Sequence, residues 1–190
     1  MRKLIFGCGY LGLRVADRWI ADGTPVCAVT RDQQRVSSLQ SRDIEPLVGD
    51  IMAPDTLRRL PAADTVLFAV GYDRRCGHPI RELYVGGLRN VLEHLPRGVS
   101  RFIYVSSTGV FGQSDGNWVD EASPCEPTRE GGRACWQAEL LLQQHPLGRR
   151  AVVLRMAGLY GPGRIPRGKE LQAGLPIDAP SEGYLNLIHV

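Results

Sequence analysis

Short apolar runs alternate along the chain with longer segments in which apolar residues recur every three or four positions. The runs predict β-strands, and they lie at residues 3–6, 25–30, 44–48, 65–70, 101–106 and 151–155. The longer segments predict helices near residues 10–22, 32–40, 54–60, 79–95 and 129–145. Strands separated by helices are typical of β-α-β units. The pattern therefore predicts an α/β protein with a doubly wound, mostly parallel sheet.

Two of the predicted helices carry further information. In the first, Leu11, Val15 and Trp19 recur every four residues and form one apolar stripe. The helix over residues 79–95 contains Gly86-Gly87, and each glycine costs about 1 kcal/mol in a helix interior. We therefore expect close packing there, against the sheet or against a ligand.

After Arg155 the alternating pattern gives way to turns. Glycine and proline recur between residues 158 and 183, which is typical of connecting and capping segments rather than of another β-α unit. We expect one domain over residues 1–156 and the start of a C-terminal region over residues 157–190. Because a domain seldom closes on an apolar run such as residues 187–190, we also expect this region to be truncated.

Charge and hydropathy exclude several classes of function. The 190 residues carry a net charge of +3, and no run of Lys and Arg exceeds two residues, so we predict no nucleic-acid partner. No apolar stretch approaches the ~18 residues that cross a membrane. Residues 4–6 are too few for a signal-peptide core. These features favour a cytoplasmic protein with no membrane partner.

The cysteines argue against a disulfide framework and against a metal site. Their number is odd and no C-x-x-C pair occurs; they are Cys8, Cys27, Cys76, Cys125 and Cys135. Cys8 has two interpretations. A following helix N-terminus can lower the pKa of its thiol, or Cys8 is a small residue that fills a loop, which we favour.

Residues 7–12, Gly-Cys-Gly-Tyr-Leu-Gly, lie between the first predicted strand and the first predicted helix. A G-x-G-x-x-G spacing in this position indicates the phosphate-binding turn of a Rossmann fold. Gly7 permits the tight turn, Gly9 lets a pyrophosphate approach the backbone, and Gly12 lets the helix pack closely. Tyr10 and Leu11 open the helix, whose free N–H groups attract phosphate. A glycine-rich turn without a ligand is the alternative.

The end of the second predicted strand indicates which dinucleotide is bound. An NAD site places Asp or Glu about 20 residues after the glycines. Here Thr30 and Arg31 occupy that position, and a hydroxyl and a guanidinium can both hold a 2′-phosphate. Asp32 is the nearest carboxylate, and we expect it to cap the next helix. The sequence therefore favours NADP over NAD.

Two further strand ends supply candidate cofactor-binding residues. Asp50 and Ile51 follow the third predicted strand, where the carboxylate can accept from the adenine amino group; a solvated turn aspartate is the alternative. Ala69, Val70 and Gly71 end the fourth predicted strand. Small residues there leave room for a ligand that crosses the carboxyl edge of the sheet.

Several segments, in order and over nearly the whole chain, resemble the extended branch of the short-chain dehydrogenase/reductase superfamily, which includes nucleoside-diphosphate-sugar epimerases and dehydratases. These segments are residues 7–12, 49–50, 84–92, 102–112, 118–124, 154–163 and 186–190. The resemblance implies an NAD(P) cofactor, a small polar substrate such as a nucleotide sugar, and oxidoreductase or epimerase chemistry. It is compatible with an oligomer.

The superfamily's chemistry implies four residues, which this chain matches incompletely. Ser107 matches the serine that holds the substrate oxygen. When the following helix is anchored on Glu139, the family's Tyr-x-x-x-Lys pair falls on Gly131 and Cys135. The family's asparagine falls on Tyr84. The resemblance thus implies an intact cofactor site beside a degraded catalytic tetrad.

No other part of the chain supplies the pair, because its two lysines, Lys3 and Lys169, do not follow a tyrosine by four residues. Ser107 and Thr108 are candidates to orient a substrate oxygen. Tyr84 is a candidate for the gap left by the missing asparagine, and without a neighbouring cation we expect it to titrate near the ordinary tyrosine pKa of about 10.

Candidate substrate contacts lie after the sixth predicted strand. Arg155 ends that strand, where it faces either a ligand or a structural carboxylate. Tyr160 and Arg164 flank a Gly-Pro-Gly turn, at which the resembling family builds part of its substrate pocket. Two functions remain open: an NADP-dependent oxidoreductase or epimerase-like enzyme, and a catalytically silent NADP-binding sensor or assembly module.

Overall fold

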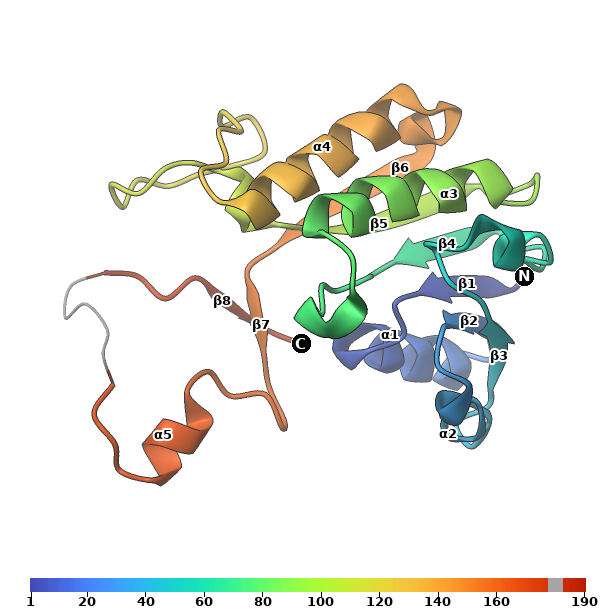
Figure 1. Cartoon of the computed structure of the whole chain (residues 1–190), viewed down its shortest axis with the longest axis horizontal. Helices are drawn as coiled ribbons and strands as arrows, with labels where there is room; N and C mark the ends of the chain where they lie inside the picture. Colours follow the sequence, from blue (N-terminus) through green and yellow to red (C-terminus); the bar gives the residue numbers. More distant parts are fainter. Residues whose placement is uncertain (178–182) are drawn as a thin grey trace.

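The structure is a computed structural model that describes residues 1–177 and 183–190. Within residues 3–156, six parallel strands form one sheet in the order β3-β2-β1-β4-β5-β6 (Figure 1). The strands are β1 (Lys3–Phe6), β2 (Val26–Thr30), β3 (Ile44–Val48), β4 (Thr65–Phe68), β5 (Arg101–Ser107) and β6 (Ala151–Met156). All six predicted strands and the doubly wound parallel sheet are confirmed.

Helices cover both faces of the sheet, with α3 and α4 on one side and α1 and α2 on the other (Figure 1). The α-helices are α1 (Tyr10–Ala21), α2 (Val36–Gln40), α3 (Gly87–His94), α4 (Glu130–Gln144) and, beyond the sheet, α5 (Gly168–Gln172). No helix in the described part of the chain combines the length and hydrophobicity that a membrane span requires.

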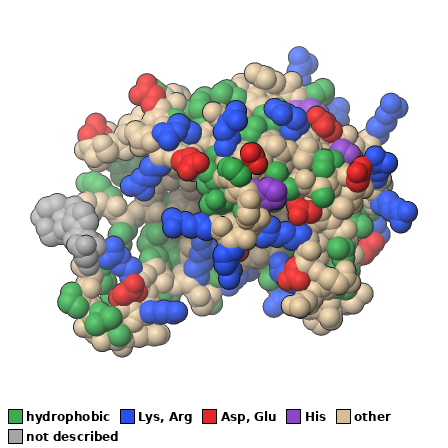
Figure 2. All heavy atoms as spheres, in the orientation of Figure 1, with side chains coloured by type: hydrophobic (Ala, Val, Ile, Leu, Met, Phe, Trp, Pro, Cys, Tyr) green, Lys and Arg blue, Asp and Glu red, His purple; other side chains and the backbone are tan. Residues whose placement is uncertain are grey.

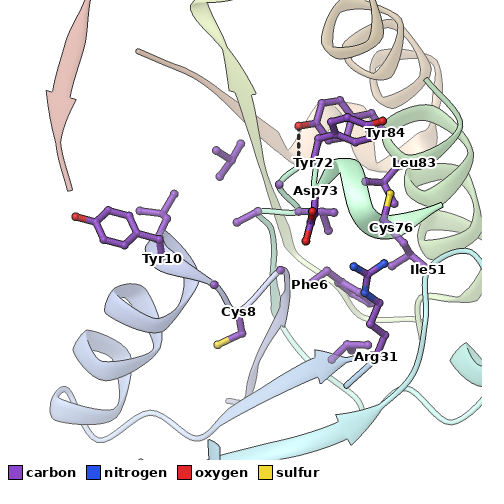
Figure 3. Close-up of a pocket in the computed structure, with 18 of the residues that line it drawn as sticks. Phe6, Cys8, Tyr10, Arg31, Ile51, Tyr72, Asp73, Cys76, Leu83 and Tyr84 are labelled. Atoms are coloured by element: carbon purple, nitrogen blue, oxygen red, sulfur yellow. Dashed lines mark hydrogen bonds between the residues drawn. The ribbon is translucent and has the colours of Figure 1, made fainter. Parts of the chain in front are cut away.

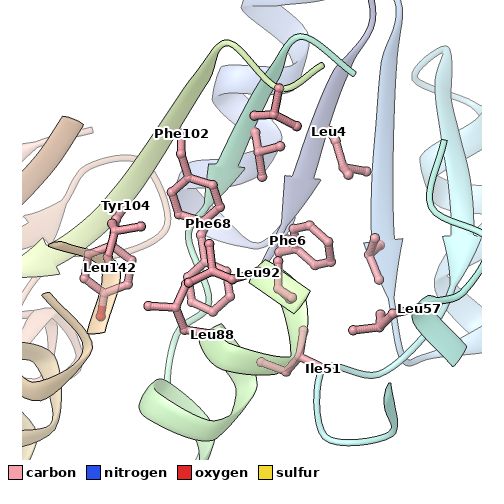
Figure 4. Close-up of a cluster of buried hydrophobic side chains, with 14 of the residues drawn as sticks. Leu4, Phe6, Ile51, Leu57, Phe68, Leu88, Leu92, Phe102, Tyr104 and Leu142 are labelled. Carbon is pink, nitrogen blue, oxygen red and sulfur yellow. The ribbon is translucent and has the colours of Figure 1, made fainter. Parts of the chain in front are cut away.

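Alternate residues of the inner strands supply two hydrophobic layers, because successive strand side chains point to opposite faces. Leu4 and Phe6 join Phe68 in the layer beneath α3 and α4 (Figure 4). Ile5 joins Ala28 in the layer beneath α1 and α2. All five side chains are almost fully buried.

The strand order determines where a ligand can bind. From the centre of the sheet the chain runs outward through β2 and β3, then returns to place β4 on the other side of β1. Ligands of such sheets bind at this reversal, outside the carboxyl ends of the strands. The turn after β1 and the turn after β4 therefore lie together.

Two predicted helices differ from expectation. Residues 54–60 form only a short 3₁₀ helix, Pro54–Leu57, and the segment leading into α3 contains a π-helical turn, Glu82–Gly86. The expected close packing holds at Gly87, where an added Cβ would lie 2.5 Å from Ile51 Cδ1, whereas Gly86 faces open space.

The C-terminal region contains more regular structure than its glycines and prolines predict. β7 (Gly158–Tyr160) pairs in parallel with β8 (Leu187–His189), and α5 lies between them in the chain. These strands form a small sheet of their own, and within the described residues no seventh β-α unit joins the main sheet, as expected. The apolar run at residues 187–189 pairs with β7 and stays separate from the main sheet.

Candidate cofactor and catalytic site

A pocket of about 770 Å³ opens at the carboxyl ends of the central strands (Figure 3). Its volume lies in the range of cofactor and small-molecule sites. Of the predicted cofactor-binding residues, the following line it: Gly7, Gly9, Tyr10, Leu11, Thr30, Arg31, Asp50, Ile51, Ala69, Val70 and Gly71. Residues from four strand ends thus meet in one cavity, as the topology requires.

The three glycines after β1 have different roles. Gly7 has a φ of +86°, and an added Cβ would lie 2.3 Å from the Ala69 carbonyl oxygen. Gly12 lies outside the pocket, where a Cβ would approach the Gly7 carbonyl oxygen to 2.5 Å. Gly9 lines the pocket, and no atom of the described residues lies within 4 Å of an added Cβ. Gly7 and Gly12 therefore shape the turn, and Gly9 leaves backbone open to a ligand.

Two arginines follow β2 at the pocket. Arg31 points into it (Figure 3), and Arg35 donates from Nη2 to the Cys8 carbonyl oxygen over 2.7 Å. Thr30 is buried, and its hydroxyl accepts from the Asp32 N–H. Asp32 caps the following turn by accepting from the Gln34 N–H at 2.9 Å, as predicted.

Sequence reasoning missed Arg35. A basic residue four positions after Arg31 was the available signal, but its partner in the glycine-rich turn is 27 positions away. The space-filling view shows basic side chains gathered around the central hollow of the visible face (Figure 2).

The turn after β3 is held by its own polar groups. The Asp50 carboxylate accepts from the Met52 N–H at 2.8 Å. Asn90 on α3 donates from Nδ2 to the Ile51 carbonyl oxygen over 2.7 Å. These bonds fix the position at which Asp50 and Ile51 border the pocket.

Cys8 is a buried loop filler, the interpretation we favoured. Burial raises the pKa of its thiol to about 11, although the nearby Arg35 guanidinium opposes this effect. Since the thiolate is the reactive form, Cys8 is protonated and unreactive near neutral pH.

The predicted catalytic residues separate into two locations. Ser107 and Tyr84 line the pocket. The Ser107 hydroxyl accepts from the Gly109 N–H at 3.0 Å. Thr108 instead lines a separate cavity beside β6, and its hydroxyl accepts from Asn186 Nδ2 at 2.9 Å. The structure therefore brings Ser107, but not Thr108, to the pocket.

The two positions at which the resemblance places the family's Tyr-Lys pair, Gly131 and Cys135, lie on the first turns of α4. An added Cβ at Gly131 would make an ordinary contact, 3.5 Å from Ile80 Cδ1. Cys135 lines the pocket, and burial raises the pKa of its thiol to about 11. The two lysines of the sequence lie elsewhere, since Lys3 pairs with Asp64 at 2.9 Å and Lys169 belongs to α5.

The pKa of Tyr84 differs from the expected value. Burial raises the pKa of its phenol above the ordinary value, and Cys135 adds to this effect. The expectation of an unperturbed pKa near 10 was therefore wrong, because it ignored desolvation of the phenolate.

Arg155 faces a structural carboxylate, one of the two alternatives that the sequence left open. Its guanidinium donates to both carboxylate oxygens of Glu139, the shortest contact being 2.8 Å. Ser106 donates to the same carboxylate over 2.5 Å. The guanidinium also lies 5.0 Å from the Phe111 ring centroid. Arg155 therefore joins β6 to α4, outside the pocket.

We expect Arg155→Ala to lower the free energy of unfolding by about 3 kcal/mol, because it leaves a buried carboxylate unpaired. This value lies at the lower end of the stability losses usual for a broken buried ion pair. We choose it because the Arg155 side chain is 20% exposed, whereas that of Glu139 is 6% exposed. Urea denaturation measures the effect. The matched control is Arg58→Ala, which removes an exposed ion pair and should leave the midpoint unchanged; equal losses in the two variants would contradict the prediction.

The remaining predicted substrate residues also separate. Arg164 lines the pocket, with its guanidinium 5.2 Å from the Tyr10 ring centroid. The Tyr10 hydroxyl donates to the Pro162 carbonyl oxygen at 3.2 Å, which joins the Gly-Pro-Gly turn to α1. Tyr160 lies outside the pocket and packs edge-on against His189.

The doubly wound sheet, the glycine-rich turn and the pocket at the strand reversal define a protein with a Rossmann-type α/β fold. The chain belongs to the NAD dependent epimerase/dehydratase family, whose model matches residues 4–175. Members of this family bind NAD(P).

Relatives of known sequence and structure agree with this assignment. The chain is 32% identical to Protein YeeZ of Escherichia coli (strain K12), over 100% of this chain and 69% of YeeZ. It is 28% identical to N-acetyl-alpha-D-glucosaminyl-diphospho-ditrans,octacis-undecaprenol 4-epimerase of Escherichia coli O157:H7, over 83% of this chain and 48% of that enzyme. A solved structure from Methylobacillus flagellatus, described provisionally as an NAD-dependent epimerase/dehydratase, matches with a TM-score of 0.78 and 32% identity, over 99% of this chain and 65% of that one.

Proposed function

We propose that this protein is an NADP-dependent oxidoreductase of the epimerase/dehydratase family that acts on a small polar substrate. The observation that carries the proposal is the open backbone at Gly9, where an added Cβ has no neighbour within 4 Å although Gly9 borders the pocket. A pyrophosphate approaches such a position, and the N-terminus of α1 favours its charge. When bound, the nicotinamide ring supplies or accepts a hydride.

Within this proposal, the residues around the pocket have the following roles. Gly9, Tyr10 and Leu11 hold the pyrophosphate. Asp50 and Ile51 border the adenine, and Ser107 orients the substrate oxygen. Arg164 contacts an anionic group of the substrate. A sugar joined through a diphosphate is a substrate of the required type, and the name of the undecaprenol 4-epimerase relative indicates such a compound.

NADP is the proposed dinucleotide because Arg31 and Arg35 both border the pocket at the end of β2, and because Asp32 already caps the next turn. We expect Arg31→Ala to weaken NADPH binding at least tenfold and to leave NADH binding unchanged, since a charge-assisted hydrogen bond contributes roughly 1.5–3 kcal/mol. Fluorescence titration with both cofactors measures this. Equal affinities for the two cofactors, or an equal loss for both, would contradict NADP preference.

A second function, an NADP-binding sensor or assembly module without turnover, is favoured by one observation. Gly131 and Cys135 occupy the positions of the family's Tyr-Lys pair. NADPH binding without hydride transfer to or from any substrate in a broad panel, nucleotide sugars included, would select this second function.

A further inference from the structure

We propose that Tyr84 is the proton donor of this site and that the substrate is a ketone or aldehyde that the protein reduces. The proposal rests on the proposed function, because the reduction uses NADPH as the hydride source. Three structural observations support it: the backbone conformation that presents Tyr84, the hydrogen bond to its oxygen, and the lack of a cation among the described side chains that face it.

The π-helical turn Glu82–Gly86 presents Tyr84 to the pocket. Such turns are rare and occur frequently at functional sites, because one extra residue per turn re-aims a side chain. Leu83 and Tyr84 both border the pocket, but Leu83 is buried in the core whereas Tyr84 is half-buried. The turn therefore holds the phenol where a ligand can reach it.

A backbone N–H fixes the Tyr84 oxygen. The Tyr72 N–H donates to Tyr84 Oη at 3.1 Å, and the two rings meet edge to face with centroids 6.5 Å apart (Figure 3). Because the amide uses a lone pair of the oxygen, the phenolic hydrogen remains available to a substrate. The same N–H stabilises the phenolate that remains after the proton leaves.

In the described part of the chain, the titratable side chains that face Tyr84 are phenols and a thiol, and none is a cation. They come from three elements: Tyr72 from the turn after β4, Tyr104 from β5 and Cys135 from α4. Burial raises the pKa of Tyr84, of Tyr104 and of the Cys135 thiol, so each keeps its proton. Tyr84 therefore has a proton to give near neutral pH and is rarely able to accept one.

This protonation state favours reduction over oxidation. In reduction, the carbonyl carbon gains a hydride from NADPH, the π bond to oxygen breaks, and the oxygen takes a proton. The Tyr84 O–H bond breaks to supply that proton, and solvent later reprotonates the phenolate. Oxidation of an alcohol begins with the scarce phenolate. An epimerase or dehydratase cycle begins with that oxidation, so we expect simple carbonyl reduction to be the faster reaction.

Tyr84→Phe tests the proposal, with Tyr184→Phe as the matched control because Tyr184 is 88% exposed and does not line the pocket. NADPH affinity should stay within twofold in both variants. Reduction of a panel of ketones and aldehydes, including 4-keto sugars on nucleoside diphosphates, should fall about 10²–10⁴-fold in Tyr84→Phe alone. The difference in ultraviolet absorbance between wild type and Tyr84→Phe during a pH titration should place Tyr84 ionisation above pH 10.

The outcomes separate this proposal from the one on which it rests. Failure of the wild-type protein to bind NADPH would overturn the proposed function as well. NADPH binding with no reduction of any carbonyl compound, or with equal reduction by Tyr84→Phe, would overturn the role of Tyr84 alone. Because Tyr84→Phe also removes the acceptor of the Tyr72 N–H, a fluorinated tyrosine at position 84 provides a second test. Its more acidic phenol should shift the pH dependence of reduction to lower pH.

Discussion

Gly9→Val should weaken dinucleotide binding at least 100-fold while the protein remains folded. The added side chain has no protein atom within 4 Å of its Cβ, so it projects into the pocket, where it would occupy the pyrophosphate position. A 100-fold loss corresponds to about 2.8 kcal/mol of binding free energy. NADPH titration by fluorescence, together with thermal unfolding of the free protein, measures both parts of the expectation.

Gly12→Val is the matched control, because it makes the same change three positions along the motif. Its Cβ would lie 2.5 Å from the Gly7 carbonyl oxygen, which the backbone cannot accommodate without moving. We expect this variant to lose thermal stability, unlike Gly9→Val. If Gly9→Val bound NADPH as well as the wild-type protein, the cofactor site would lie elsewhere.

Alcohol oxidation by this protein should rise about tenfold per pH unit between pH 6 and pH 9, whereas carbonyl reduction should stay level. Burial raises the pKa of Tyr84 above its ordinary value, so the protonated phenol predominates throughout this range. The phenolate fraction, about 10⁻³ or less at pH 7, increases tenfold with each unit. Initial rates of kcat/KM in both directions, with NADP and NADPH, measure the two profiles.

A plateau of the oxidation rate near neutral pH would contradict this prediction, because it would reveal a base that is already ionised there. In the control variant Tyr84→Phe, the pH dependence of oxidation should disappear. The double variant Gly131→Tyr/Cys135→Lys should bring such a plateau, since an ammonium beside a phenol stabilises the phenolate. The space at Gly131 admits a side chain, because the nearest atom to an added Cβ is 3.5 Å away.

The sequence predicts much of the fold because the relevant signals are local. Apolar runs of four to six residues locate all six strands, and the stripe of Leu11, Val15 and Trp19 locates α1. The predicted roles of Gly7 and Gly12 agree with the close approaches found in the structure. Their context, between a strand and an amphipathic helix, carries this information within a dozen residues.

The resemblance indicated the family and placed its Tyr-Lys pair on Gly131 and Cys135, but it did not reveal the surroundings of the other side chains. Thr108, in the turn after β5, and Arg155, on β6, lie outside the pocket and line a second cavity instead. Arg155 pairs with Glu139, sixteen positions away on another element. No pattern within the chain distinguishes such a structural carboxylate from a ligand.

The tertiary structure alone decided three features of the site. Arg35 donates to the carbonyl of Cys8, Tyr84 lies within a π-helical turn, and the Tyr72 N–H donates to the phenol oxygen of Tyr84. Two of these features depend on contacts between elements, and the third depends on one extra residue in a helical turn. The spacing of hydrophobic residues along the sequence predicts neither kind of feature. The sequence by itself determined the α/β sheet and its glycine-rich turn, because those depend on hydrophobic periodicity and on the backbone freedom of glycine. The packing of the elements then determined the burial of Tyr84 and the direction of proton transfer that we propose.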